Sequence, residues 1–405
     1  MRIKDICDYV SRGATPDYVD ESPYKVMNQA TFSKGWLDES NVRYTSKAIQ
    51  DAQIQKGDLI MASTGGGVLG KVFYYDSNDN HFYADSHVSI LRNSRGANLM
   101  KYLYYFFSVR YDEINATLVK GSTNQTELQR NYLLAYELDI PSLQVQQRIV
   151  EYLDAKTTEI DKKIELLGKK RDAYKRLKIA TINHAVIRGL DEHVKLKDTD
   201  IDWIGEIPVH WETRRIKDEV EVNKLTLTES TSPMYKFRYI DISNVSSEGV
   251  ISFIEEVYFY EAPSRARRIV QKGDIIVSTV RTYLKSIGMI DFDAKDVVVS
   301  TGFAVLSPIK SYSKYFYYLL RSNHLIDEIC ALSSGVSYPA IAATRIESIN
   351  IPVPPLEEQK QIAAYLDERC AKIDAAVTII DKQIDALKRL KRSLINEVVT
   401  GKRTI

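Results

Sequence analysis

The amino-acid sequence predicts an α+β protein: two globular α/β domains in tandem, separated by two long helices that pair as an antiparallel coiled coil. Three observations support this prediction. The sequence contains an internal duplication, the duplicated stretches carry apolar residues at coiled-coil spacing, and the remaining segments alternate short β-branched runs with turns. The two halves would therefore be related by a pseudo-twofold repeat.

The duplication is strongest between residues 141–186 and 354–399, which share 19 identities in 46 aligned positions at an offset of 213. The preceding segments match in register, because each contains Arg-Ile-Lys-Asp, starting at Arg2 and Arg215, and Gln-Lys-Gly-Asp, starting at Gln55 and Gln271. We therefore expect a first domain over 1–140, a central helix over 141–188, a linker over 189–214, a second domain over 215–352 and a C-terminal helix over 353–405.

Each duplicated stretch has apolar residues spaced alternately three and four apart, which is the pattern of a coiled-coil seam. About 45 residues at 1.5 Å per residue make a rod of roughly 65 Å, so the helix pair would also act as a spacer. Cys370 falls on this seam and is interpreted as a small buried apolar residue. The predicted seam residues are Leu153, Ile160, Ile164, Leu167, Leu366, Ile373, Val377, Ile380, Ile384 and Leu387.

Bulk composition indicates an ordinary globular protein without a dominant charge. The formal net charge is +1, so binding of nucleic acid would have to depend on local basic patches. The three cysteines are far apart and show no metal-binding spacing, which is typical of the reducing cytoplasm. No segment resembles a signal peptide or a membrane span, so we expect a cytoplasmic protein with no membrane association.

Polar loops in the two domains are the candidate contacts to DNA. Hydroxyl and basic side chains suit phosphates, arginine suits guanine, and asparagine or glutamine suits adenine. The alternative interpretation of each residue is an ordinary surface position. The candidates in the first domain are Ser63, Thr64, Lys71, Lys120, Ser122, Thr123, Asn124 and Gln125. Those in the second domain are Arg265, Arg267, Arg268, Ser278, Thr279, Arg281, Tyr283, Lys285, Ser337 and Tyr338.

Motifs of catalysis and cofactor binding are weak or missing. Residues 65–71, Gly-Gly-Gly-Val-Leu-Gly-Lys, match a phosphate-binding loop in their glycine spacing, but Val72 opens a predicted strand where that mechanism needs a helix N-terminus. A hairpin turn or close backbone approach to DNA is the favoured interpretation. The six histidines show no ligand spacing. The sequence also contains no amino-methyltransferase tetrapeptide and no nuclease carboxylate–lysine cluster. We expect no catalytic, cofactor or metal site on this chain.

The linker and duplicated helices resemble the type I restriction–modification specificity subunits. The resemblance is carried by Trp203-Ile204-Gly205-Glu206-Ile207-Pro208 with His210-Trp211, and by Pro354-Pro355-Leu356-Glu357-Glu358-Gln359 with Tyr365-Leu366-Asp367. It covers essentially the whole chain. One departure is that the segment before Arg215 has no counterpart before Arg2, so the first domain would start abruptly or the chain would be trimmed.

The resemblance implies a non-catalytic, sequence-specific subunit of a DNA adenine methyltransferase and restriction complex. Each target-recognition domain would read one half of a bipartite site in double-stranded DNA, and the helices would set the gap and dock two methyltransferase subunits. S-adenosylmethionine would bind those subunits, which flip the target adenine out of the duplex. ATP and magnesium would bind two restriction subunits, where these join the complex.

Two other classes of function compete with this interpretation. The chain could be an assembly scaffold whose domains do not bind DNA, in which case changing Arg281 and Lys285 would leave DNA affinity and target choice unaltered. It could instead be a self-sufficient methyltransferase, in which case the purified chain would bind S-adenosylmethionine and methylate DNA alone.

Overall fold

The computed structural model describes residues 1–405 except 95–96, 121–125, 253–254 and 336. The chain forms two compact units. Unit 1 comprises Met1–Gly168 with Lys382–Ile405, and unit 2 comprises Lys169–Asp381. Each unit therefore contains one globular domain together with parts of both long helices.

Unit 1 is built on two four-stranded sheets. The first is antiparallel with the order β1-β8-β5-β6, and the second has the order β2-β4-β3-β7 with β3 parallel to β7. Strands β9 and β10 form a separate antiparallel pair. The strands are β1 (Tyr9–Arg12), β2 (Tyr18–Val19), β3 (Lys25–Met27), β4 (Arg43–Thr45), β5 (Leu59–Ala62), β6 (Val72–Tyr74), β7 (Phe82–Ala84), β8 (Val88–Arg92), β9 (Val119–Lys120) and β10 (Glu127–Leu128).

Short helices complete unit 1 and cover its first sheet. Helix α3 carries a run of aromatic residues after Lys101, and most of these rings are buried against the sheet and the long helices. The helices are α1 (Ile3–Ile6), α2 (Gln29–Phe32), η1 (Glu39–Asn41), α3 (Ala97–Ser108), α4 (Tyr111–Thr117) and α5 (Arg130–Ala135). A second, smaller apolar core lies between the two sheets.

Unit 2 repeats the antiparallel sheet of unit 1 and the parallel strand pair of its mixed sheet, but the fourth strand of the mixed sheet lies at the opposite edge. Its antiparallel sheet has the order β14-β21-β18-β19, and its mixed sheet has the order β16-β15-β20-β17 with β15 parallel to β20. The strands are β14 (Val220–Val222), β15 (Lys236–Ile240), β16 (Glu255–Tyr258), β17 (Ala266–Ile269), β18 (Ile275–Ser278), β19 (Ile287–Met289), β20 (Val297–Ser300) and β21 (Phe303–Pro308). The predicted duplication of an α+β domain is thus confirmed at the level of sheet topology.

The helices of unit 2 pack as they do in unit 1. They are α7 (Ile216–Glu219), η2 (Ile242–Asn244), η3 (Thr282–Leu284), α8 (Ser313–Leu320), α9 (Asn323–Ala331) and α10 (Ala343–Glu347). The linker folds into short strands of this unit: β11 (Leu196–Asp198) pairs with β12 (Glu206–Pro208), and β13 (Glu212–Arg215) pairs with β22 (Asn350–Val353). Trp211 is fully buried beside them.

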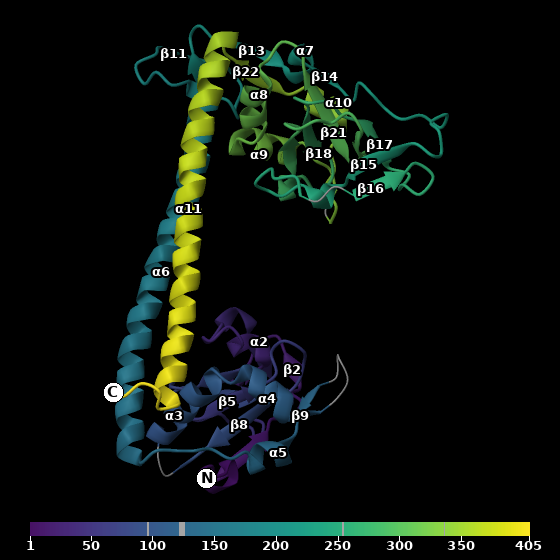
Figure 1. Ribbon diagram of the computed structural model, residues 1–405. Helices are drawn as coiled ribbons and strands as arrows, with labels where there is room; N and C mark the ends of the chain where they lie inside the picture. The colour runs from purple at the N-terminus through teal and green to yellow at the C-terminus, as the bar shows by residue number, and fades with distance from the viewer. Residues whose placement is uncertain (95–96, 121–125, 253–254, 336) are drawn as a thin grey trace. The chain divides into compact units, whose positions relative to one another are not determined.

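The two long helices, α6 (Leu143–Arg188) and α11 (Leu356–Val399), pair antiparallel within each unit (Figure 1). In unit 1, Lys391 Nζ lies 2.6 Å from Asp161 Oδ2, and in unit 2, Lys178 Nζ lies 2.6 Å from Asp374 Oδ2. Both members of one pair are 213 residues from the corresponding members of the other, so the ion pairs are symmetry mates of the repeat. The pairing predicted from the heptad-like spacing is confirmed.

Most predicted seam residues are buried in this pairing. Leu153, Ile160, Leu366, Ile373, Ile380, Ile384 and the neighbouring Cys370 are 0–7 % exposed. Ile164, Leu167, Val377 and Leu387 are half-buried. Burial raises the pKa of the Cys370 thiol, which keeps it protonated. No helix in the described part of the chain is long and apolar enough to cross a membrane.

Both repeated tetrapeptides have a local structural explanation. In each copy of Arg-Ile-Lys-Asp, the aspartate accepts a hydrogen bond from the backbone N–H of the arginine, at 3.1 Å for Asp5 and 3.2 Å for Asp218. In each copy of Gln-Lys-Gly-Asp, the buried aspartate accepts from the glutamine N–H at 2.7 Å, and the glycine has a φ near +95°. The repeated residues are therefore turn and cap residues.

Candidate nucleic-acid interface

A groove of about 980 Å³ in unit 2 gathers four of the residues predicted to contact DNA. It lies where β18 ends, beside η2. The four predicted residues that line it are Arg265, Thr279, Arg281 and Tyr338. They come from segments up to 73 residues apart, so the tertiary structure brings together positions that the sequence analysis treated as separate loops.

Arg281 occupies the mouth of this groove in an unusual backbone conformation. Its φ and ψ of 49° and 50° are left-handed, which costs a residue with a side chain about 1–3 kcal/mol. Its backbone N–H donates to the carbonyl of Pro339 at 2.7 Å, and its guanidinium lies 4.6 Å from the centroid of the Tyr338 ring. An exposed arginine beside an exposed tyrosine ring is suited to base edges and to stacking.

Lys285 is also left-handed, with a φ of 56°, so it and Arg281 bracket the single turn η3. Thr282 anchors this turn inside the protein, because it is buried and shares a 2.9 Å hydrogen bond with Ser333. The turn therefore presents Tyr283 outward, where it is 53 % exposed. Lys285 Nζ donates to the side-chain oxygen of Asn323 at 3.2 Å.

The three arginines before the Gly-Asp turn have different surroundings. Arg265 lines the groove and pairs with Asp241 at 2.6 Å, and its hydrogen bonds to Tyr239 and Asp241 raise its pKa. Arg267 lies over the Phe259 ring at 4.8 Å and outside the groove lining. Arg268 donates to the hydroxyl of Thr226 at 3.2 Å and is also outside the lining.

Ser63 and Ser278 are buried, so these two predicted contacts are corrected by the structure: their hydroxyls serve the fold. Ser63 is 1 % exposed and shares a 2.6 Å hydrogen bond with Ser89. Ser278 is 4 % exposed and donates to the carbonyl of Val280 at 2.7 Å. Ser63 directly follows β5 and Ser278 ends β18, and the spacing of residues in the sequence did not reveal that both side chains are buried.

The corresponding position of unit 1 carries different chemistry. Thr64 bridges to Glu127 as Val280 bridges to Ala340, so the two loops are equivalent in the sheet. Here the Thr64 hydroxyl shares a 2.8 Å hydrogen bond with His87 Nδ1, and the Gln29 amide donates to the Thr64 carbonyl at 2.5 Å. Unit 1 therefore presents a hydroxyl, an imidazole and an amide where unit 2 presents an arginine and a tyrosine.

The remaining first-domain candidates are placed as follows. Lys71 is half-buried, and its backbone carbonyl accepts a hydrogen bond from the N–H of Ala62 at 2.9 Å. Residues 65–71 form a turn that leads into β6, as predicted for this glycine-rich motif. Lys120 ends β9. Ser122, Thr123, Asn124 and Gln125 lie outside the described residues. In unit 2, Ser337 is exposed.

Gln29, His87 and Asp241 were not among the contact residues predicted from the sequence. Gln29 and Asp241 both follow the parallel central strand of their mixed sheet, at β3 and β15. One signal in the sequence could have identified this position. Asn28 and Asp241 are polar residues at the same place in the two repeats, 213 residues apart, and Gln29 directly follows Asn28.

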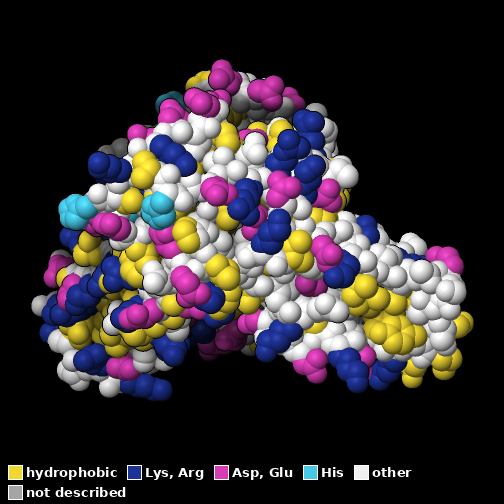
Figure 2. Space-filling view, turned by 90° about the horizontal axis from the view of Figure 1, so that it is seen from above, with side chains coloured by type: hydrophobic (Ala, Val, Ile, Leu, Met, Phe, Trp, Pro, Cys, Tyr) yellow, Lys and Arg dark blue, Asp and Glu magenta, His cyan; other side chains and the backbone are white. Residues whose placement is uncertain are grey.

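Basic and acidic side chains intermingle over the face of the molecule seen in Figure 2. This agrees with the net charge of +1, so any contact with DNA would depend on local groups such as Arg281. Among the residues that the structure describes, no group of three or more His, Cys, Asp or Glu side chains could hold a metal ion.

Two similar domains with unlike polar loops, mounted on a pair of long helices, define a tandem recognition protein. The family model "Type I restriction modification DNA specificity domain" matches residues 1–169 and 208–389. The chain therefore belongs to the family of type I restriction–modification specificity subunits, which the sequence analysis named on the linker and helix motifs.

Individual relatives agree with this assignment. The type I restriction enzyme MjaVIII specificity subunit of Methanocaldococcus jannaschii is 23% identical, covering 99% of this chain and 92% of that protein. A chain in a structure of the assembly and conformational transition of the type I R-M system has a TM-score of 0.71 at 16% identity, covering 98% of this chain and 96% of its own length. The HsdS subunit of Thermoanaerobacter tengcongensis has a TM-score of 0.50 at 17% identity, covering 100% and 96%.

Proposed function

We propose that this chain reads a bipartite DNA sequence, with one recognition domain on each half of the site and no catalysis of its own. The observation that carries the proposal is the contrast at one equivalent position of the two domains. Arg281 with Tyr338 suits guanine and stacking, whereas Thr64, His87 and Gln29 suit other base edges. Two readers with a common scaffold and unlike contact groups would recognise an asymmetric site.

The domain limits proposed for the readers are 1–140 and 215–352, with 189–214 as the connection. The long helices over 141–188 and 353–405 would set the gap between the half-sites and dock two methyltransferase subunits. S-adenosylmethionine would bind those subunits, and ATP and magnesium would bind two restriction subunits where present. Acting on cellular DNA, the complex would work in the cytoplasm.

The contact residues proposed are those that are exposed or half-buried in or beside the groove and its unit 1 counterpart. Arg281 and Tyr338 would approach bases, while Lys285, Tyr283, Ser337 and Lys71 would lie near the backbone of the DNA. Arg265 and Thr279 would shape the groove, and Arg267 and Arg268 would contribute charge. Lys120 and residues 122–125 stay predictions from the sequence.

The test is Arg281→Ala in the full chain, co-expressed with its cognate methyltransferase subunits, with modified adenines mapped across the genome. Loss of one bidentate base contact costs about 1–3 kcal/mol, so one position of one half-site should become degenerate while the other half stays unchanged. Arg345→Ala, an exposed arginine of α10 outside the groove, is the matched control.

An unaltered methylation motif and unaltered DNA affinity for Arg281→Ala would contradict the assignment of this loop. A continuous palindromic motif would contradict the two-reader arrangement. Methylation of DNA by the purified chain alone would show that the chain is itself an enzyme.

A further inference from the structure

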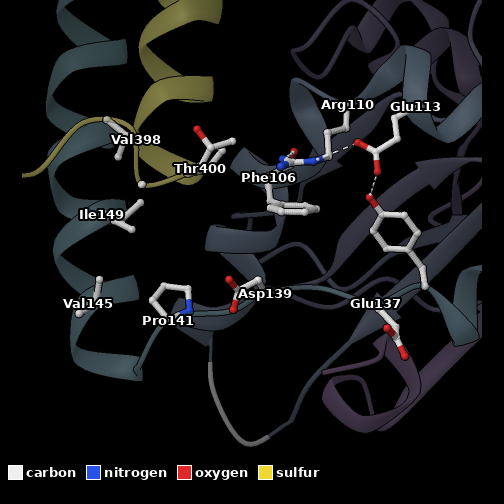
Figure 3. A pocket seen from close by; sticks show the side chains of 13 residues that line it. Phe106, Arg110, Glu113, Glu137, Asp139, Pro141, Val145, Ile149, Val398 and Thr400 are labelled. Carbon is white, nitrogen blue, oxygen red and sulfur yellow. Dashed lines mark hydrogen bonds and ion pairs between the residues drawn. The ribbon is translucent and has the colours of Figure 1, made fainter.

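The polar groups of unit 1 are not equally suited to DNA. Among the described residues that line a hollow of about 620 Å³ in this unit, one is a cation, Arg110, and three are carboxylates, Glu113, Glu137 and Asp139 (Figure 3). Glu113 also holds the guanidinium of Arg110 at 3.2 Å. An acidic surface of this kind repels phosphate, so we expect the base contacts of unit 1 at its other polar position, the loop around Thr64.

Three side chains meet at the hydroxyl of Thr64. Its oxygen lies 2.8 Å from His87 Nδ1 and 3.1 Å from Gln29 Nε2. The same amide nitrogen donates to the backbone carbonyls of Thr64 at 2.5 Å and of His87 at 3.2 Å. A carbonyl oxygen only accepts hydrogen bonds, so these partners fix which end of the Gln29 amide is the nitrogen. Oε1 is therefore the end of the amide that the loop does not use.

The hydrogen bonds also assign the tautomer of His87. Gln29 approaches the Thr64 hydroxyl as a donor, and among the described residues the structure pairs this hydroxyl with one acceptor, His87 Nδ1. Nδ1 therefore accepts, and the neutral ring carries its hydrogen on Nε2. His87 is exposed, and within the described residues neither its Nε2 nor Gln29 Oε1 has a hydrogen-bond partner. A donor and an acceptor thus stand beside each other at the surface.

Gly65 leaves the Gln29 acceptor uncovered. Its ideal Cβ position is 3.4 Å from Gln29 Oε1, so a side chain at residue 65 would lie against the acceptor. The φ of Gly65 is +85°, a conformation that glycine adopts without strain. Nearby, Arg12 forms an ion pair with Glu127, so its guanidinium is held within the protein. The groups left for a ligand are the neutral imidazole and the amide oxygen.

One donor beside one acceptor complements the major-groove edge of adenine. Adenine presents the acceptor N7 and the donor amino group N6, whereas guanine presents two acceptors, N7 and O6. His87 Nε2–H would donate to N7, and Gln29 Oε1 would accept from the N6 amino group. Guanine would instead place O6 against Gln29 Oε1, with no hydrogen between the two acceptors. The guanidinium of Arg281 in unit 2 has donors only and suits guanine.

On the basis of the proposed reading of one half-site by each domain, we propose that His87 and Gln29 together read one adenine in the half-site of unit 1. Thr64 is a positioning residue, because its hydroxyl sets the tautomer of His87 and its carbonyl sets the orientation of the Gln29 amide. The preference for adenine would then belong to two side chains 58 residues apart, neither of which distinguishes adenine from guanine alone.

Methylome mapping locates the position, with the full chain in complex with its cognate methyltransferase subunits. His87→Ala and Gln29→Ala should each relax the same adenine position of one half-site, whereas Arg281→Ala should relax the other half-site. Gln53→Ala and His81→Ala are the matched controls, because both residues are exposed in unit 1 and carry the same functional groups. The two controls should leave the motif unchanged.

Base analogues test the individual atoms without altering the protein. Fluorescein-labelled duplexes carry 7-deazaadenine, which lacks the N7 acceptor, or purine, which lacks the 6-amino group, at the mapped position. Each analogue should weaken binding of the parent complex at least about fivefold in fluorescence anisotropy, because one hydrogen bond to a base is lost. The His87→Ala complex should no longer distinguish 7-deazaadenine from adenine, and the Gln29→Ala complex should no longer distinguish purine from adenine.

A change of specificity gives a further test. Gln29→Arg keeps N–H groups for the carbonyls of Thr64 and His87, but it places a donor where Oε1 was. The mapped base at this position should therefore change from adenine to guanine. Retention of adenine by a Gln29→Arg complex that still methylates DNA would contradict the acceptor role of Oε1.

The outcomes separate this inference from the function on which it rests. If Arg281→Ala relaxes one half-site while His87→Ala and Gln29→Ala leave the motif intact, the adenine contact is overturned and the reading of DNA by unit 2 stands. A base other than adenine at the mapped position, or full binding of both analogues by the parent complex, would overturn it in the same way. A motif that none of these variants alters would overturn the proposed function and this inference together.

Discussion

Asp58 and Asp274 are repeat mates in the Gly-Asp turns, and both are buried, yet their electrostatic surroundings differ. Asp58 pairs with Arg92, with Nε–Oδ1 and Nη2–Oδ2 distances of 2.7 Å. Asp274 accepts the same backbone hydrogen bond from Gln271. Burial raises the pKa of the Asp274 carboxyl, since the charged form loses water. In unit 1 the charge of the Asp58 carboxylate is therefore balanced by Arg92. In unit 2 the equivalent turn buries the Asp274 carboxylate, which disfavours its charged form.

Replacement by asparagine should separate the two cases. Asp58→Asn leaves the partly buried Arg92 guanidinium without its counter-ion and should destabilise unit 1 by about 3 kcal/mol. Asp274→Asn keeps an acceptor for Gln271 and removes a buried charge, so unit 2 should change by less than about 1 kcal/mol. Hydrogen–deuterium exchange in β5 and β18 measures each effect. Equal losses in both units would contradict the difference in charge compensation.

The raised pKa of Asp274 also predicts a pH dependence. A carboxyl whose pKa is higher in the folded than in the unfolded state penalises folding above its folded pKa, and this penalty is relieved as the pH falls through that value. The stability of Asp274→Asn relative to the parent chain should therefore decrease between about pH 7 and about pH 4. Urea unfolding followed by fluorescence of the buried Trp211 in unit 2 reports it. A difference that does not vary with pH would refute the prediction.

At the scale of elements, the domain in each unit is attached to a long helix by the same three residues. A lysine and a tyrosine, one helical turn apart, converge on the aspartate of Tyr-Leu-Asp, with tyrosine O–H to carboxylate distances of 2.6 Å in unit 1 and 2.8 Å in unit 2. The lysine also contacts the second carboxylate oxygen in each copy. The residues are Lys101, Tyr105 and Asp154 in unit 1, and Lys314, Tyr318 and Asp367 in unit 2.

The two attachments differ in one position. Thr157, 3.3 Å from the Tyr105 hydroxyl, is replaced in the second copy by Cys370, so Tyr318 has no equivalent hydroxyl there. Asp154→Ala should cost about 1 kcal/mol because Thr157 remains as a partner, whereas Asp367→Ala should cost about 2 kcal/mol because a buried phenol loses its acceptor. Urea midpoints of the two variants test this. A larger loss for Asp154→Ala would refute the explanation.

At the scale of the whole molecule, the helix pair obeys the same twofold repeat as the domains. Lys391 with Asp161 and Lys178 with Asp374 are equivalent contacts, one in each unit. The start of each helix packs with the end of the other: Leu153 with Val398 in unit 1, and Leu366 with Val186 in unit 2 lie in common cores. Each half of the protein is thus completed by the other copy's helix.

If the helices set the gap between half-sites, lengthening both should lengthen the gap. Duplicating residues 162–168 and 375–381 adds one heptad to each helix and preserves the seam. Seven residues at 1.5 Å span about 10 Å, or about three base pairs at 3.4 Å each. Methylome mapping should show unchanged half-sites separated by about three more base pairs. An unchanged gap would contradict the spacer role, and duplication in only one helix should destabilise the pair.

Much of this organisation was accessible before the structure. The helix pair followed from the spacing of Leu366, Ile373 and Ile380, and the turns followed from the repeated glycines at 57 and 273. The groove of unit 2 that is proposed to contact DNA could be predicted from the sequence only in part. Arg281 and Tyr338 were identified as separate loop residues, whereas their contact, and the participation of Gln29, depends on strand pairing across segments that no local pattern records.

The sequence by itself determined the duplication, the two long helices and the Gly-Asp turns, because these features depend on residues close together in the chain or at a constant offset. Only the tertiary structure decided which polar side chains face outward. Ser63 and Ser278 are turned inward by their sheets, while Arg281 is held outward by a left-handed backbone. It also decided that Trp211 is buried in unit 2 between the end of α6 and the start of α11, because this contact joins segments that lie far apart in the chain.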